Sequence, residues 1–116
     1  MEGYWVTHFR AGPFDGEGLV MLHEGELVGG DAERVWRGTY EVNGSHVYAR
    51  VRIVPLVTRD EEELMAREKP QILSLEGTWT GEYAWLDGHP DEREDMPFHL
   101  EMQRCHSKRN ERVQAA

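Results

Sequence analysis

Short runs of alternating apolar and polar residues, separated by turns that contain glycine, most constrain how this chain can fold. Two such runs, residues 35–42 and 46–57, flank Asn43-Gly44. Asn-Gly between alternating runs is the strongest short-range signal of a β-hairpin, because its type I′ turn needs φ > 0 at both central residues. The sequence therefore predicts an antiparallel hairpin with Asn43 and Gly44 at the centre of its turn.

Further runs of this kind predict strands along most of the chain. They cover residues 4–9, 18–23, 26–28, 72–75, 79–87 and 96–105. Gly29-Gly30-Asp31 interrupts the series and predicts a tight corner or a bulge, since adjacent glycines allow positive φ and close backbone approach. About eight short strands result, a number typical of an all-β, antiparallel up-and-down barrel or of a sandwich.

The segment from Thr58 to Pro70 differs from the rest of the chain in composition. Thr58 followed by Glu61 matches a capping box, acidic residues fill the first turn, and Arg67 and Lys69 lie near the end. Pro70 cannot continue a helix. The segment predicts one short helix near residues 59–69, and a charged loop is the alternative.

The composition sets the class of protein. With 116 residues and a net charge of −9, the chain suits one acidic globular domain, which we place at residues 1–105, followed by a basic, flexible tail at residues 106–116. An acidic surface disfavours nucleic acid as the main ligand. No apolar run approaches the roughly 20 residues of a membrane helix, and no signal peptide is recognisable. Cys105 is the only cysteine, so no intrachain disulfide can form, and we expect a cytoplasmic protein.

The interior of the predicted barrel is expected to be lined by bulky side chains. An eight-stranded barrel either holds one small ligand or is filled by its own side chains, and so many large residues in a short chain favour the filled interior. Besides Trp5 and Tyr40, the expected lining residues are Phe9, Met21, Trp79, Tyr83, Trp85, Phe98 and Met102.

The sequence offers no convincing catalytic, metal or cofactor site. His99 and Cys105 share a strand face but lie roughly 20 Å apart in an extended strand, too far to bind one ion. His106 neighbours Cys105 yet points to the opposite face, so it is a poor base for that thiol. The acidic runs 60–63 and 91–95 are crowded and polar, unlike paired carboxyls in a pocket. We therefore expect no enzyme, no metal and no cofactor.

Residues 1–54 resemble the GrlR family, small bacterial regulators of type III secretion genes. The resemblance rests on the order and spacing of glycine-based motifs. These are Gly3-x-Trp5, Gly16-Glu17-Gly18, Gly25, Gly29-Gly30-Asp31, Gly38-x-Tyr40 and Asn43-Gly44.

The resemblance implies a lipocalin-like eight-stranded barrel that is usually dimeric and that binds and holds off a transcriptional activator. In the founding member, an exposed acidic run at the hairpin after the Gly-x-aromatic strand is important for the partner. Here the corresponding region holds Glu41, Asn43, Gly44, Ser45 and His46, without the acidic run. Gly3-x-Trp5 also resembles the lipocalin signature, in which an arginine of a late strand, here Arg104, packs over the tryptophan.

These observations predict a regulatory or adaptor protein that acts by binding a protein partner, at the Glu41–His46 hairpin, and that forms a homodimer. A transcriptional regulator is the partner that the resemblance suggests. The alternative is a lipocalin-like carrier of a small apolar ligand or lipid. An exposed surface patch would favour the first function, and an open barrel mouth above a dry apolar cavity would favour the second.

Overall fold

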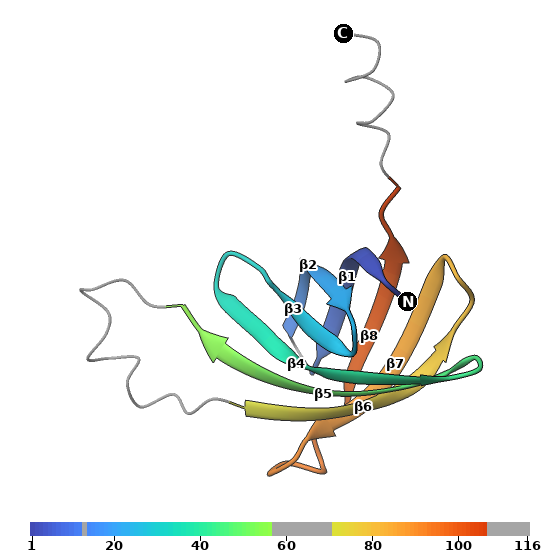
Figure 1. The fold of residues 1–116 in the computed structure, drawn as a ribbon. Helices are drawn as coiled ribbons and strands as arrows, with labels where there is room; N and C mark the ends of the chain where they lie inside the picture. Colours follow the sequence, from blue (N-terminus) through green and yellow to red (C-terminus); the bar gives the residue numbers. More distant parts are fainter. Residues whose placement is uncertain (13, 57–70, 107–116) are drawn as a thin grey trace, which may run out of the picture.

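The computed structural model describes residues 1–12, 14–56 and 71–106 and shows a closed, antiparallel barrel of eight strands (Figure 1). The strands follow one another around the barrel in the order of the sequence. They are β1 (Gly3–Ala11), β2 (Phe14–His23), β3 (Glu26–Gly30), β4 (Arg34–Asn43), β5 (His46–Pro55), β6 (Gln71–Trp79), β7 (Tyr83–Pro90) and β8 (Phe98–Arg104). The prediction of an all-β barrel is confirmed.

The barrel closes because β1 pairs with both β2 and β8. Trp5 lies opposite Val20 on one side and opposite Arg104 on the other. Beyond the last ladder pair, the backbone N–H of Cys105 donates to the carbonyl of Tyr4 at 2.9 Å. Both chain ends of the described barrel therefore lie together (Figure 1).

Side chains alternate between a buried interior and an exposed outer surface, as strand geometry requires. On β5, Val47, Ala49 and Val51 are buried while Arg50 and Arg52 are exposed. The last strand behaves in the same way. Its inward residues are Phe98, Leu100 and Met102, and His99, Glu101 and Gln103 point outward. On both strands, the buried and exposed positions follow the alternation of apolar and polar residues in the sequence.

Three predicted lining residues are on the wrong side. Met21 pairs with the exposed Tyr4, whereas its neighbours Val20 and Leu22 are buried. Tyr83 and Trp85 are exposed, because the predicted single strand over residues 79–87 is in fact broken by a turn at Thr80–Glu82, where Gly81 has φ 83°. That turn reverses the chain and shifts the alternation. Ala84 and Leu86 face inward opposite Trp79 and Gly77.

The β4–β5 hairpin has a different turn from the one that the sequence predicts. In the β4–β5 hairpin, Asn43 pairs with His46, so the central residues are Gly44 and Ser45. Only Gly44, at φ 62°, has positive φ there, a pattern typical of type II′ rather than type I′. The prediction of positive φ at Asn43 is therefore wrong. Glu24 and Gly25 instead form the type I′ pattern between β2 and β3, with φ 49° and 82°.

The predicted corner at Gly29-Gly30-Asp31 is present. Gly29 faces inward at the end of β3, where a Cβ atom would lie less than 3.0 Å from the backbone of β2. The carboxylate of Asp31 then accepts the backbone N–H groups of Glu33 and Arg34 at 2.7 Å each. The aspartate thus turns the chain from β3 into β4.

Two predicted segments lie outside the described residues. They are the helix near residues 59–69 and most of the tail at residues 106–116, of which only His106 is described. Within the described ranges, the structure contains no helix with the length and apolarity needed to cross a membrane.

Candidate functional site

One end of the barrel is closed by Trp5 and Arg104. The Trp5 side chain is fully buried, and the guanidinium of Arg104 lies 4.5 Å from the centroid of its ring. Arg104 also donates hydrogen bonds to the carbonyls of Gly81 at 2.7 Å and Glu2 at 2.5 Å. The indole N–H of Trp5 donates to the carbonyl of Met1 at 3.0 Å. The predicted packing of Arg104 over Trp5 is confirmed.

The interior at the other end is filled by three aromatic rings. Phe9 stacks on Phe98 with ring centroids 5.7 Å apart and meets Trp36 edge-to-face at 5.6 Å. Gly16 and Gly18 of β2 make room for these rings, because a Cβ atom at either position would lie less than 3.0 Å from a ring atom of Phe9 or Trp36. Trp36 was not among the predicted lining residues, although it shares the strand face of Gly38 and Tyr40.

A polar atom without a partner lies between these two ends. Thr7 is fully buried on the inner face of β1, and its hydroxyl has no hydrogen-bond partner within the described part of the chain. Burying a hydroxyl without a hydrogen bond costs about 1–3 kcal/mol. A polar group of a bound molecule that reached this hydroxyl would supply the missing hydrogen bond.

The hairpin predicted to bind a partner is exposed, but it is held against the neighbouring turn. The indole N–H of Trp79 donates a hydrogen bond to the carbonyl of Gly44 at 2.9 Å. The backbone N–H of Trp79 donates another to the carbonyl of Ser45, also at 2.9 Å. Glu41 and Asn43 are exposed, and His46 is partly buried, with its ring 4.5 Å from that of Tyr48. Trp79, which is partly buried against the core, therefore holds the tip of the hairpin in place.

Exposed apolar side chains gather on the outer surface of β1, β2 and β3. Val6 lies opposite Leu19 and Tyr4 opposite Met21, which in turn lies opposite Val28. Tyr4, Val6 and Leu19 are exposed, and Met21 and Val28 partly so. We call these five residues the apolar face. None of them is charged, which is notable in a chain with a net charge of −9.

A second outer surface, on β6, β7 and β8, combines aromatic and acidic side chains. Tyr83 and Trp85 stack with ring centroids 6.0 Å apart and an interplanar angle of 20°. Trp85 lies opposite Glu101, and Asp87 lies opposite Glu76. We call these five residues the aromatic–acidic face. Tyr83 and Val6 both lie opposite Gln103, so this face adjoins the apolar face across β8.

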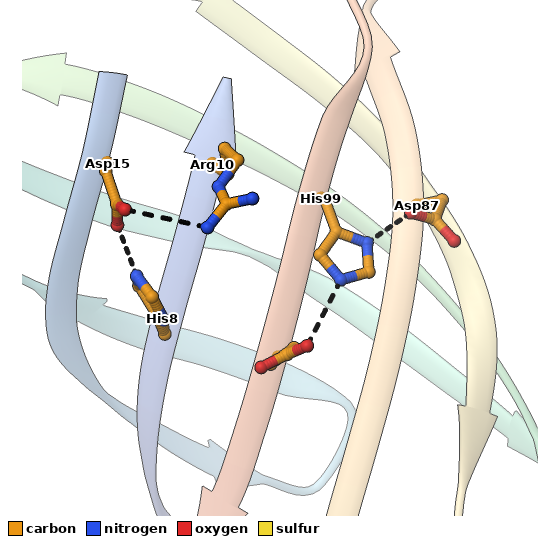
Figure 2. A network of polar contacts seen from close by, with 6 residues as sticks. His8, Arg10, Asp15, Asp87 and His99 are labelled. Carbon is orange, nitrogen blue, oxygen red and sulfur yellow. Dashed lines mark hydrogen bonds and ion pairs between the residues drawn. The ribbon is translucent and has the colours of Figure 1, made fainter. Parts of the chain in front are cut away.

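Histidines and carboxylates form two groups of polar contacts on neighbouring strands, one of which includes Asp87 and Glu101 of the aromatic–acidic face (Figure 2). His99 lies between two acidic groups, with Nδ1 2.5 Å from Asp87 and Nε2 3.4 Å from Glu101. Across β1, Asp15 contacts both His8 and Arg10, the latter at 3.8 Å. The hydrogen bond to Asp87 raises the pKa of His99, since the carboxylate favours the protonated ring.

Cys105 and the carboxylates of the aromatic–acidic face lie on the open surface of the barrel. Among residues 1–12, 14–56 and 71–106, no group of three or more His, Cys, Asp or Glu side chains could hold a metal ion. Cys105 is exposed. The carboxylates of the aromatic–acidic face lie on an open sheet surface rather than in a pocket that excludes water. What the site can offer is contact area, aromatic rings and charge.

Neither the scan of protein-family models nor the search of curated proteins finds a match to this chain.

Proposed function

We propose that this protein is a non-enzymatic, cytoplasmic regulator or adaptor that acts by binding a protein partner. The observation that carries the proposal is the apolar face, where Val6 and Leu19 form an exposed cross-strand pair beside Tyr4. Contiguous exposed apolar surface on a folded domain is typical of a binding site. The GrlR-like motifs of residues 1–54 support the same proposal and suggest a transcriptional activator as the partner.

The proposal is tested by affinity capture from a bacterial lysate with three versions of the protein. The Val6→Ser/Leu19→Ser variant removes two side chains of the apolar face. The Val54→Ser variant makes the same kind of change at an exposed valine of β5, outside both faces. A protein retained by the wild type and the control but lost by the double variant supports the proposal. Equal retention by all three contradicts it.

The same face is proposed to join two copies of the chain. An uncharged surface suits contact between identical acidic molecules, because two copies there bring no like charges together. Light scattering on the purified protein is expected to give twice 13.5 kDa, and the Val6→Ser/Leu19→Ser variant to give the monomer mass. A wild-type monomer at every concentration would contradict the dimer without affecting the capture result.

A lipocalin-like carrier remains the second candidate, and the buried hydroxyl of Thr7 favours it. If the interior holds a small molecule, native mass spectrometry should detect an added mass that is lost on denaturation. Thr7→Val preserves the side-chain shape and removes the hydroxyl. We expect it to raise the free energy of unfolding by about 1 kcal/mol if the interior is dry. A loss of stability together with a loss of the added mass would favour the carrier.

A further inference from the structure

We propose that the aromatic–acidic face binds a lysine- or arginine-rich segment of a partner protein. This proposal rests on the proposed function, since it specifies the chemistry of the partner. It concerns a surface different from the predicted hairpin and from the apolar face.

The first observation is the stacked pair of Tyr83 and Trp85. Their exposed fractions are 45% and 40%, although the interior of this barrel takes up most other aromatic rings. Two aromatic rings at the surface offer their electron-rich faces to a guanidinium or ammonium group. Tryptophan and tyrosine also contribute disproportionately to binding energy at protein interfaces. The pair is therefore suited to a cationic side chain with an apolar stem.

The second observation is that the surrounding carboxylates have only histidines as ion-pair partners among the described residues. Asp87 and Glu101 contact His99, and Glu76 lies 3.5 Å from His46. Some other carboxylates of the barrel are paired with arginine instead. Arg50 contacts Asp91 at 2.5 Å, for example. Three carboxylates face two histidines here, so the face has excess negative charge even when both rings are protonated.

The negative charge of the aromatic–acidic face favours a basic segment over a second copy of the chain. A second copy related by a two-fold axis would bring the same carboxylates against each other, which costs free energy. A segment with several lysines or arginines would instead pair with Glu76, Asp87 and Glu101 and stack on Trp85. The boundary of the face toward β1 is set by Arg10 and His8, both of which contact Asp15 (Figure 2).

The test is an NMR titration of the full chain, labelled with nitrogen-15, with a short peptide of alternating arginine and serine. We expect the indole N–H of Trp85 and the amides of Tyr83, Asp87 and Glu101 to shift first. Added sodium chloride should weaken binding, since exposed charges are screened. A peptide with glutamate in place of arginine should cause no shift. Shifts spread evenly over all acidic residues, or no binding at all, would overturn the proposal.

A matched pair of variants separates a specific face from general negative charge. Asp87→Asn/Glu101→Gln is expected to weaken peptide binding about fivefold to tenfold, and so is Trp85→Ala. Glu26→Gln/Glu92→Gln removes the same charge from exposed positions of β3 and of the β7–β8 connection and should leave affinity within about twofold. Equal weakening by both double variants would show that only net charge matters, and would overturn the proposal.

Two further outcomes are distinguishable. If the peptide binds only after Lys108, Arg109 and Arg112 are replaced by serine, the occupant is the chain's own basic segment, and the partner is excluded.

The Val6→Ser/Leu19→Ser variant should still bind the peptide. Loss of partner capture with peptide binding intact would contradict the proposed function alone, whereas capture without peptide binding would contradict this inference alone.

Discussion

The two ends of the barrel are closed in different ways. At the first end, hairpin turns of two or three residues join β2 to β3, β4 to β5 and β6 to β7. The side chains of Arg104 and Trp5 donate hydrogen bonds to backbone carbonyls there and hold the chain together. At the other end, Phe9, Trp36 and Phe98 pack by ring contact alone, and longer connections follow β5 and β7. The comparison shows that hydrogen bonds hold one end of the barrel together, whereas the other end is held by the packing of aromatic rings.

The largest expected loss of stability comes from a substitution at the first end of the barrel. Trp5→Ala should lower the free energy of unfolding by about 3–5 kcal/mol, because it empties a fully buried site and leaves Arg104 without its ring. Phe9→Ala, at the partly exposed end, should cost about half as much. Urea unfolding followed by circular dichroism measures both. Equal losses would mean that the two ends contribute alike.

A smaller effect tests how tightly the second end is packed. Gly18→Ala places a methyl group against the Trp36 ring and the carbonyl of Gly30, so something must move. We expect a loss of about 1–3 kcal/mol by the same urea measurement. Thr39→Ala, at an exposed position of β4, is a suitable control. If Gly18→Ala were as stable as the wild type, the aromatic cluster would be loosely packed.

A stabilising change is expected at the turn between β2 and β3. Glu24 has φ 49°, a conformation that asparagine adopts at lower cost than glutamate. Glu24→Asn should therefore raise the melting temperature, by the equivalent of about 0.5–1 kcal/mol. This variant keeps the backbone N–H of residue 24. That group donates a hydrogen bond to the carboxylate of Glu2 and lowers the pKa of Glu2. A lower melting temperature would show that the Glu24 side chain itself is needed.

The smallest effect concerns the outer surface and depends on pH. Because the pKa of His99 is raised above 6.5 in the folded state, its contact with Asp87 stabilises the fold fully below that pH. The contribution is lost as the pH rises through the raised value. His99→Gln should therefore destabilise the protein more at pH 5.5 than at pH 8.5 in urea unfolding. The difference should become smaller in an Asp87→Asn background, where Glu101 still contacts the His99 ring at 3.4 Å. An undiminished difference there would exclude the Asp87 contact as its main cause.

Strand faces could be predicted where alternation runs unbroken, as on β5 and β8. The prediction failed at Tyr83 and Trp85, because Gly81 is a turn residue and the two aromatic residues after it continue the apparent alternation of Trp79. Nothing in the local pattern shows that the chain reverses there. The same error concealed the aromatic–acidic face, which exists only because these rings point outward.

Long-range contacts were less accessible to local reasoning. The resemblance suggested that Arg104 packs over Trp5, but spacing alone gives no reason to join residues so far apart. Met21 and Val20 are both apolar, so alternation on β2 does not reveal which of them faces inward. The pairing of β2 with β1 determines that Val20 faces inward, because Val20 lies opposite the buried Trp5.

The pairing of β1 with β8 has a consequence for synthesis of the protein. During translation, β1 emerges first, yet its second partner is the last strand of the barrel. Until residues 98–104 leave the ribosome, β1 has one row of unpaired N–H and C=O groups, an edge at which another chain can add. We expect nascent chains stalled before Phe98 to aggregate or to recruit chaperones, and chains that include β8 to escape both.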